Sequence, residues 1–357
     1  MNSSRVPKVA IIILNWNSWR DTIECLDTVF KLLYPAFNVI LIDNHSKDES
    51  IEKITGWIND HPMSHFILEK LDELYPEIHK SSNIFRYKNN DRLLETRKLS
   101  LDSMKNLFLL NNENSGFAVA NNIGMRIAKH VYSSDYYFLL NNDTIIDSEA
   151  LLYLVNVMDE NPSVGAAQSV IYHYDKPDRI ANAGGKLLWW GQTRYYHKIG
   201  KSDFRKISFI NGCALCIRKE IVDLYGGLSG KFFFGEEDFE LSMRLKKKKV
   251  ALACATKSKV YHKIGNSTKT NLEGQIEKKV FLFIVNRVVD MRSFYPNWIW
   301  EIWRVLIMLY FGYLLIIKYE RPWRKMKYVT RKAYHLSGKI RRVDRNLVEN
   351  ILSGTQL

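Results

Sequence analysis

Apolar runs and amphipathic stretches alternate along the first half of the chain. Residues 8–14 (KVAIIIL) form a continuous β-branched run, which is typical of a strand buried on both faces. A helix is predicted next, because apolar side chains recur at helical spacing after Asn17 and Ser18, either of which can cap it. The alternation continues with strands predicted at 39–42, 107–110, 136–140 and 164–170, and with helices after Asp48, after Gly116 and at 150–158. This order predicts βαβ units, and so an α/β domain with a Rossmann-like, mainly parallel sheet flanked by helices.

Two parts of the chain depart from this pattern. A polar, Lys/Asn/Glu-rich stretch between about residues 57 and 106 predicts an insertion on the sheet rather than a separate domain. Residues 207–218 have mixed strand character. We therefore expect one domain over residues 1–270, with the insertion at about 57–106, and a helical tail over residues 271–357.

The tail combines an apolar segment with a basic one. Residues 298–317 are strongly apolar, but Glu301 and Arg304 leave only the 13 residues from Val305 to Ile317 uncharged. A membrane span needs roughly 20 apolar residues. Trp and Tyr side chains flank the segment, and many Lys and Arg residues follow it with little opposing charge. These features favour a helix that lies on an anionic membrane surface, with a polybasic extension. The alternative is an oligomer interface beside a solvated basic face.

Composition and charge narrow the class of protein. The chain has 357 residues, 46% of them hydrophobic, and a formal net charge of +14, much of which lies in the tail. Its four cysteines are too few and too scattered for a disulfide framework. Cys213 and Cys216 have the spacing of half a zinc site, but no second pair completes it, and we interpret both as small apolar residues on a strand. The N-terminal apolar run is too short for a signal peptide. These observations predict a cytoplasmic protein, peripherally attached to the inner face of the membrane.

Polar residues gather where the apolar runs end. Short stretches rich in Asn, Asp and Ser follow four predicted strands, namely residues 15–17, 43–48, 111–117 and 141–143. Each stretch alone fits a turn or a helix cap. In an open α/β sheet, however, ligands bind beyond the carboxyl ends of the strands. Four such ends on one edge predict a pocket.

Six segments, in this order, carry a family resemblance: VAIIILNWN, VILIDNHSKDES, NNENSGFAVANNIG, FLLNNDT, GGLSGKFFFGEEDFELSMRL and HKIGNST. Together they resemble the nucleotide-sugar glycosyltransferases of family 2, which have the GT-A fold, and most closely a rhamnosyltransferase-like branch. The resemblance covers residues 8–268 apart from the insertion. It implies an inverting, metal-dependent hexosyl- or deoxyhexosyltransferase with a UDP- or dTDP-type donor and a glycan or lipid-linked acceptor, in the synthesis of cell-surface polysaccharide.

The resemblance also implies a nucleotide site. Asp43 resembles the carboxylate that accepts a hydrogen bond from the pyrimidine base, and the segment around Asn15 lines the same pocket. The loop at 114–117 and the helix after it resemble the part that approaches the ribose and diphosphate, where free helix N–H groups favour an anion. The nucleotide-binding residues implied in this way are Asn15, Asn17, Asp43, Ser46, Asn114, Gly116, Phe117, Asn121 and Asn142.

A metal site is implied next to the diphosphate. Asp143 matches the last residue of the family's Asp-x-Asp element, which holds Mn²⁺ or Mg²⁺, and Asn141 stands where the first Asp is usual. Hard cations prefer carboxylate oxygens and share them with phosphates and water. His262 resembles a histidine that completes this site, although a lone His is more often structural. Asn141 and Asn142 also suit a turn.

The segment FFFGEED at 232–238 is implied to carry the chemistry. Asp238 resembles the general base that deprotonates the acceptor hydroxyl, with Glu237 beside it. The simpler interpretation is that the acids only complement the dipole of a helix that begins there. Arg244 can serve the leaving diphosphate or can pair with Glu240 one turn earlier. The acceptor pocket is implied at Trp189, Trp190, Asn211 and Gly212, where the two tryptophans suit either sugar stacking or the core.

Two other functions remain at this stage. A nucleotidyltransferase shares the sheet and the acidic strand ends, but NWNSWRD after the first strand is not a Gly- and Lys/Arg-rich phosphate loop. A non-catalytic nucleic-acid binder uses a basic tail, but it needs no carboxylates at the edge of a sheet. We therefore expect no nucleic-acid partner.

Overall fold

The first apolar run forms the central strand of a large mixed sheet in the computed structural model, which describes residues 5–61, 65–70, 106–263, 275–318 and 320–354. This strand, β1 (Val9–Asn15), lies between β2 and β5 and is parallel to both. Across the sheet the order is β11-β13-β7-β12-β5-β1-β2-β4-β3. The half from β5 to β3 is parallel, whereas β12 runs antiparallel to β5 and β7. The prediction of an α/β domain with a mainly parallel sheet is confirmed.

The strands of this sheet after β1 are β2 (Phe37–Asp43), β3 (Phe66–Lys70), β4 (Asn106–Leu110), β5 (Tyr136–Asn141), β6 (Thr144–Ile146), β7 (Val164–His173), β8 (Lys176–Asn182), β11 (Phe204–Ile207), β12 (Ala214–Arg218) and β13 (Ala251–His262). A separate hairpin consists of β9 (Gly185–Leu187) and β10 (Thr193–Tyr195). Most of the predicted insertion, residues 71–105, lies outside the described residues.

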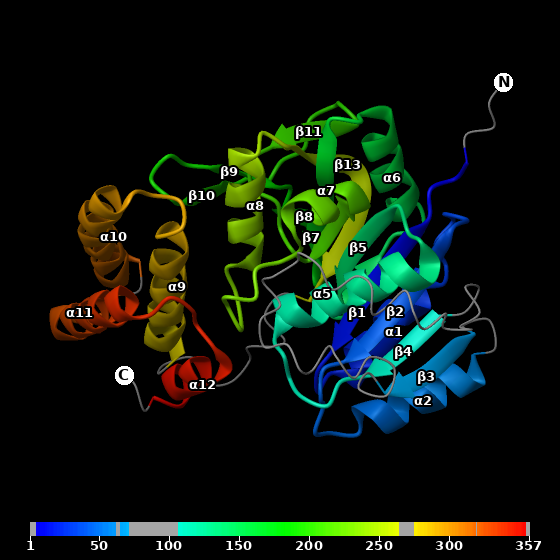
Figure 1. Ribbon diagram of the computed structural model, residues 1–357, viewed down its shortest axis with the longest axis horizontal. Coiled ribbons are helices and arrows are strands. Elements are labelled where there is room, and N and C mark those ends of the chain that lie inside the picture. The colour runs from blue at the N-terminus through cyan, green and yellow to red at the C-terminus, as the bar shows by residue number, and fades with distance from the viewer. Residues whose placement is uncertain (1–4, 62–64, 71–105, 264–274, 319, 355–357) are drawn as a thin grey trace.

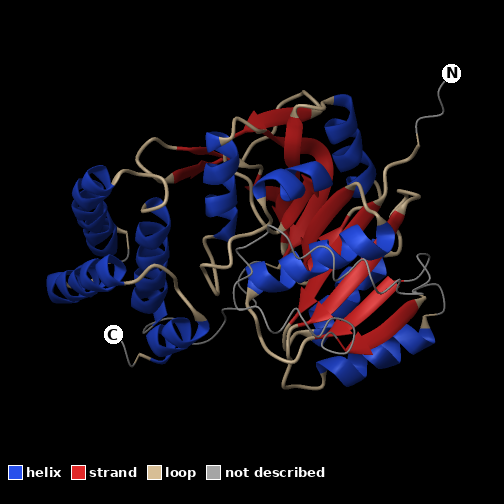
Figure 2. Ribbon diagram, viewed as in Figure 1, coloured by secondary structure: helices blue, strands red, loops and turns tan. Residues whose placement is uncertain are grey.

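Helices cover both faces of the sheet, as Figure 2 shows. One face packs against α1 (Trp19–Val29), α2 (Ser50–Asp60) and α6 (Ala150–Glu160). The other packs against α5 (Phe117–Ile127), its π-helical extension η2 (Ala128–Tyr132), α7 (Lys219–Tyr225) and α8 (Glu237–Lys247). Alternate residues of β1 enter the two layers: Ile11 belongs to the first cluster and Ile12 to the second. This alternation explains why the run is apolar throughout.

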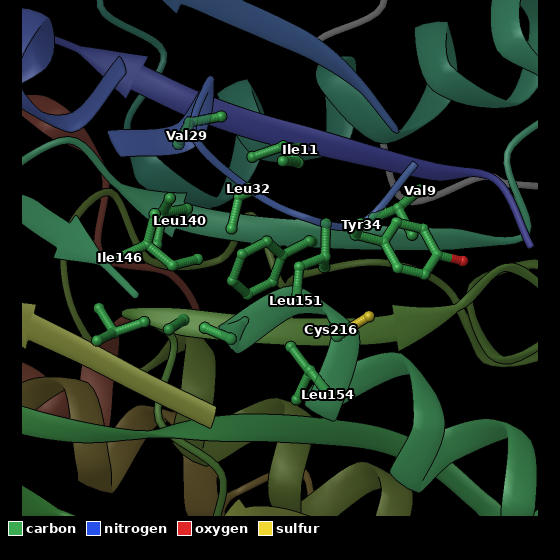
Figure 3. Close-up of a cluster of buried hydrophobic side chains, with 14 of the residues drawn as sticks. Val9, Ile11, Val29, Leu32, Tyr34, Leu140, Ile146, Leu151, Leu154 and Cys216 are labelled. Atoms are coloured by element: carbon green, nitrogen blue, oxygen red, sulfur yellow. The ribbon is translucent and has the colours of Figure 1, made fainter. Parts of the chain in front are cut away.

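The first of these layers forms a continuous core (Figure 3). Ile11 on β1, Leu140 on β5 and Cys216 on β12 face Leu151 and Leu154 of α6, and all five are buried. Cys216 is therefore a small apolar residue on a strand, as predicted. All four cysteines are buried free thiols.

The tail folds into four helices at one end of the molecule, on the left of Figure 1. They are α9 (Gln275–Met291), α10 (Asn297–Ile317), α11 (Trp323–Lys339) and α12 (Arg345–Ser353). Their apolar faces share one hydrophobic cluster with Leu187, Phe209, Phe232 and Phe239. The tail is thus packed onto the part of the sheet domain that follows β8.

The apolar segment 298–317 forms one helix, α10, of 21 residues, and both charges inside it have partners. The Arg304 guanidinium donates to Glu301 at 2.6 Å and stacks on the Trp300 ring. Among the described residues, α10 is the helix whose length and composition suffice to cross a membrane, and 44% of its most apolar window is buried inside the protein.

Candidate active site

The four polar strand ends meet at one edge of the sheet, as the sequence predicted. Asn15 at the end of β1 lies opposite Asp43 at the end of β2 in the parallel register. The chain beyond each strand stays paired with its neighbour, since the Asn44 amide donates to the Asn15 carbonyl at 2.8 Å and the Asn111 amide donates to the Asp43 carbonyl at 2.9 Å. On the other side of β1, β5 ends at Asn141.

Asp43 is at the centre of the first cluster at this edge. Its Oδ1 accepts from Asn15 Nδ2 at 2.7 Å and from Ser46 Oγ at 2.6 Å, and its Oδ2 accepts from the Ser46 amide at 2.9 Å. Ser46 Oγ also accepts from the Asn17 amide at 2.9 Å. Asp43 is buried, whereas Asn17 is exposed. A carboxylate oxygen takes more than one donor, so Oδ2 retains capacity for a ligand N–H.

The loop between β4 and α5 forms a second cluster. The Asn44 amide group donates to Asn114 Oδ1 at 2.9 Å, and Asn114 Oδ1 also accepts from the Gly116 amide at 3.0 Å. Gly116 has φ +80°, and a Cβ there would lie 2.5 Å from the Phe233 carbonyl oxygen. The tight approach at Gly116 is therefore made by the loop that precedes α8.

Helix α5 begins directly after this glycine, at Phe117. Its first N–H groups lack intrahelical partners, so the start of the helix suits an anion. Asn121 is buried and donates to the Phe117 carbonyl at 3.0 Å, so its amide supports the first turn. Asn142, on the other side of the edge, donates to Thr22 Oγ1 at 2.8 Å. These bonds give Asn121 and Asn142 structural partners.

Asp143 and His262 form a pair beyond the ends of β5 and β13. Asp143 Oδ1 lies 3.0 Å from His262 Nε2, and both side chains are largely shielded from solvent. Beside them, Asn141 Oδ1 is a buried acceptor with no hydrogen-bond partner among the described residues. Burial opposes a charged imidazole, but the neighbouring Cys213 sulfur and Asp143 carboxylate outweigh it and raise the pKa of His262 to about 11.

This donor set fits a divalent cation that takes its remaining ligands from a substrate. A carboxylate oxygen, an imidazole nitrogen that has given up its proton and an unpaired amide oxygen suit Mn²⁺, and Mg²⁺ favours the oxygens alone. The described residues contain no group of three or more His, Cys, Asp and Glu side chains placed to hold a metal ion. Phosphate oxygens and water therefore have to complete the coordination.

The loop before α8 is held from the C-terminal side of the molecule. Glu236 has a left-handed backbone, with φ +77°, and its buried carboxylate forms an ion pair with Arg287 of α9. The Arg287 guanidinium also donates to the Gly191 carbonyl at 2.6 Å and stacks on the Phe239 ring. One arginine thus connects the loop, the β9–β10 hairpin and the start of α8.

Glu237 and Asp238 follow in the first turn of α8. Burial raises the pKa of Asp238, while its hydrogen bond with the Phe239 amide, the Arg287 charge and its hydrogen bond with the Gly212 amide counteract this shift. Burial and then the Asp238 charge raise the pKa of Glu237 to about 8. Glu237 Oε2 is buried without a hydrogen-bond partner in the described structure. Both carboxyl groups thus have raised pKa values, as is common for groups that transfer protons in active sites.

A short segment joins the catalytic candidates to the metal candidates. The Gly212 amide donates to Asp238, and the next residue, Cys213, accepts from the Asn141 amide at 2.9 Å through its carbonyl. Asn211 Oδ1 accepts from the Cys213 amide at 2.9 Å and so keeps this segment in place. Asn211 and Gly212 therefore lie between the two groups of acids, as an acceptor-binding segment must.

The two tryptophans have different environments. Trp190 packs edge-on against Tyr310 of α10, and its carbonyl accepts from Trp303 Nε1 at 2.9 Å. Trp189 is 87% exposed. Trp190 is therefore packed against the protein, as the core alternative expected. Trp189 is exposed and available to a ligand.

The comparisons with known proteins agree with this geometry. Residues 94–226 match the family described as Glycosyl transferase family 2. The resemblance to family 2 is confirmed. No curated protein matches the sequence. The matched residues run from before β4 to the end of α7 and include the Asn114 loop, Asn141 and Asp143.

Two solved structures share the fold of this chain. The mannosyltransferase PcManGT from Pyrobaculum calidifontis, in complex with GDP-Man and Mn²⁺, has 13% identity and a TM-score of 0.53, over 99% of this chain and 80% of its own. GalNAc-T7, with UDP, GalNAc and Mn²⁺, has 16% identity and a TM-score of 0.53, over 81% of this chain and 48% of its own. This chain thus spans about half of GalNAc-T7. At these identities the likeness shows the fold alone, which is GT-A.

One alternative that the sequence left open is decided by the structure. Arg244 pairs with Glu240 at 2.8 Å and donates to the carbonyls of Tyr225, Gly226 and Gly227 at 2.6 to 3.0 Å. All of its donor nitrogens are engaged by the protein. Arg244 is therefore a structural residue that fixes the loop after α7, and the suggestion that it serves the diphosphate is wrong.

Sequence reasoning missed three residues at this site. Arg287 lies 51 positions after Glu236, in a helix without a family motif. Tyr195 packs edge-on against Phe209, and burial followed by the Asp238 charge raises its pKa to about 12. Lys263, next to His262, forms ion pairs with Asp21 and Glu24 of α1. Of the three, only Lys263 could have been found from the sequence, because it is a cationic residue next to the predicted metal ligand His262.

Proposed function

We propose that this glycosyltransferase is an inverting enzyme that moves a hexose or deoxyhexose, with rhamnose as the leading candidate, from a UDP- or dTDP-linked donor. The acceptor is a hydroxyl group of a glycan or of a lipid-linked sugar, and the product serves the synthesis of cell-surface polysaccharide. The finer assignments rest on the motifs and on the geometry of the site.

The nucleotide is assigned to the edge formed by β1, β2 and β4. The nucleobase lies against the cluster of Asn15, Asn17 and Ser46, where Asp43 Oδ2 has capacity for one N–H group of the nucleobase. The diphosphate lies at the start of α5, where the residues after Gly116 present unpaired amides. Phe117 covers the ribose side of this position.

Asp143 and His262, with Asn141 Oδ1, are the residues that would hold Mn²⁺ or Mg²⁺. When bound, the metal ion neutralises the charge that grows on the diphosphate as the sugar departs. The protein itself contributes the position of Asp143, whose carbonyl accepts from the Lys263 amide at 3.0 Å. Because Lys263 is in turn paired with two acids of α1, this strand end is firmly attached to the first helix.

Asp238 is assigned as the general base. It takes the proton of the acceptor hydroxyl while that oxygen forms a bond to the anomeric carbon. The bond from that carbon to the phosphate oxygen breaks, and the nucleoside diphosphate leaves with the electron pair. A single displacement from the opposite face inverts the configuration. Glu237, with its raised pKa, stays largely protonated beside the base at neutral pH and limits the negative charge there.

The observation that carries this proposal is the connection through residues 211–213. The Gly212 amide donates to the base candidate, and the Cys213 carbonyl accepts from Asn141 at the metal side. The proposed general base and the proposed metal ligands are therefore linked by one short segment of chain.

We also propose that the reaction takes place at the inner face of the cytoplasmic membrane. Large apolar side chains on the outer face of α10 are exposed at helical spacing, mostly three or four residues apart: Trp298, Ile302, Val305, Leu306, Leu309, Tyr313 and Ile317. The opposite face of the helix packs against α9 and α11. A helix with one face on protein and the other apolar and open suits a position parallel to the membrane surface.

This placement suits a lipid-linked acceptor. Trp190 and the β9–β10 hairpin, on the acceptor side, are attached to α10 through Tyr310 and Trp303. An acceptor that emerges from the bilayer therefore reaches the acceptor side first. The family match favours glycosyl transfer over a nucleotidyltransferase, and no observation favours binding to nucleic acid.

The test is a panel of UDP-, dTDP- and GDP-sugars, scored by metal-dependent donor hydrolysis and by thermal stabilisation of the protein. We expect one pyrimidine nucleotide sugar to give both signals in the wild type and neither in Asp143→Ala. Asp203→Ala, which removes an exposed carboxylate paired with Lys257, is the matched control and should behave as the wild type. No response to any member of the panel would overturn the proposal.

A further inference from the structure

A groove of about 590 Å³ lies between α9 and α11, away from the catalytic site. Its floor is apolar, formed by Phe281 of α9 with Leu336 and Tyr328 of α11. Three cationic residues and a histidine surround the floor, namely Arg331, Lys332, His335 and Lys339. No acidic side chain lines it. A cavity of this size holds a small ligand with an apolar part and a negatively charged part.

Two cations of this groove, Arg331 and Lys339, are not paired with an acidic side chain of the described neighbouring protein. Helix α11 contains no Asp or Glu. Nearby, Arg321 and Lys325 each lie 3.3 Å from the Glu277 carboxylate of α9 and are paired. Arg331 and Lys339, by contrast, have no ion-pair partner among the residues that the structure describes. Unpaired cations around an apolar floor favour an anion that carries hydrocarbon.

The location of the groove identifies the kind of anion. Helix α11 packs against α10, whose outer face presents the exposed apolar side chains described above. In Figure 1, α10 and α11 are the helices furthest from the sheet. Because α11 packs directly on α10, a bilayer that contacts α10 also comes close to α11, and each Lys or Arg near the surface adds to the attraction by an anionic leaflet.

We propose that the groove between α9 and α11 is a headgroup site for an anionic phospholipid. The phosphate is held by Arg331, Lys332 and Lys339, and the glycerol and the first part of the acyl chains lie on Phe281 and Leu336. This inference rests on the proposed membrane position of α10, but not on the identity of the transferred sugar. The bound lipid orients the enzyme so that the β9–β10 hairpin faces the membrane.

The first test compares vesicles. Wild type should bind vesicles of phosphatidylcholine with 30 mol% phosphatidylglycerol much more tightly than vesicles of phosphatidylcholine alone. The triple variant Arg331→Gln, Lys332→Gln, Lys339→Gln should lose roughly 100-fold in affinity for the anionic vesicles. The matched control is Lys246→Gln, Lys247→Gln, Lys249→Gln, which removes the same charge from an exposed run at the end of α8. This control variant should lose less than threefold in affinity for the anionic vesicles.

The second test separates a lipid site from diffuse charge or a site for free phosphate. Dihexanoyl-phosphatidic acid, below its micellar concentration, should bind wild type with a stoichiometry of one and the control triple equally. It should not bind the groove triple, and inorganic phosphate should not compete at equal concentration. Equal losses in both triples would overturn the proposal, as would full competition by phosphate. Size-exclusion chromatography reports whether the protein is a dimer. A dimer that covers the groove and does not bind lipid would also overturn the proposal.

These outcomes are distinct from a failure of the proposed function. The exchanged side chains of the groove triple are at the surface, and donor hydrolysis in solution should remain at the wild-type level, which also reports correct folding. An enzyme that hydrolyses no nucleotide sugar can still show selective lipid binding, and an active enzyme can lack it.

Discussion

Arg287 of α9 forms a buried ion pair with Glu236, the residue directly before Glu237 and Asp238. The guanidinium also lowers the pKa of Asp238, which burial raises. A residue of the C-terminal helices thus acts on the proposed base in two ways, by holding the backbone of its loop and by favouring its ionised form.

The first prediction concerns the pH dependence of transfer. Asp238 must be ionised to act as a base, and its raised pKa places the acidic limb of the kcat/KM profile above the ordinary range of an aspartate. Loss of a nearby cation raises a carboxyl pKa further, so Arg287→Gln should move this limb to higher pH. Glu236→Gln removes a nearby negative charge and should move it to lower pH. Shifts in the same direction in both variants would contradict the role of Arg287.

The second prediction concerns Asp238 itself. Asp238→Asn keeps the shape of the side chain but cannot accept the hydroxyl proton, so kcat should fall by roughly 100-fold or more. Donor affinity, measured by calorimetry with an unreactive donor analogue, should change less than threefold. Asp203→Asn is the control. Full transfer activity in Asp238→Asn would remove the assignment of the base.

The third prediction concerns the metal. Asn141 has a buried Oδ1 without a partner next to the pair of Asp143 and His262. Asn141→Asp adds a carboxylate there and should tighten Mn²⁺ binding to the donor-free enzyme about tenfold, which is ~1.4 kcal/mol. Asp143→Ala should abolish that binding. Titration followed by electron paramagnetic resonance measures both, and weaker binding in Asn141→Asp would show that Asn141 lies outside the coordination sphere.

The fourth prediction concerns stability. Burial raises the pKa of Asp290 well above its usual range, and neither carboxylate oxygen has a hydrogen-bond partner in the described structure. The folded state therefore holds this proton more tightly than the unfolded state, so the side chain lowers stability as pH rises above the ordinary aspartate pKa towards the raised value. Asp290→Asn should raise the melting temperature at pH 8, and the gain should shrink towards pH 4. A constant gain would contradict this linkage.

The fifth prediction concerns the contact between Gly116, in the loop before α5, and Phe233, in the loop before α8. Gly116→Ala places a methyl group 2.5 Å from the Phe233 carbonyl at a residue with φ +80°, and it should cost about 2–3 kcal/mol in unfolding free energy. Gly56→Ala, at a helical position with nothing within 4 Å, should instead stabilise by about 1 kcal/mol. Denaturant unfolding of both variants tests the pair.

Local sequence patterns predicted most of the sheet domain. The run around Ile11 and Ile12 specified a strand buried on both faces, and the polar ends of β1, β2, β4 and β5 specified the edge that holds the site. These signals are visible because each depends on neighbours in the sequence. The contact of Arg287 with Glu236 and that of Gly116 with Phe233 each join segments that are distant in sequence. No local pattern therefore predicted them.

The pairing of the catalytic loop with Val343 has a consequence for biosynthesis. The Phe233 amide donates to the Val343 carbonyl at 2.8 Å, and the Val343 amide donates to the Lys231 carbonyl at 2.8 Å. Among the described residues, four helices, α8 to α11, are translated between these two partners. On the ribosome, the parallel strands and their polar edge can therefore assemble well before the loop of Asp238 is fixed.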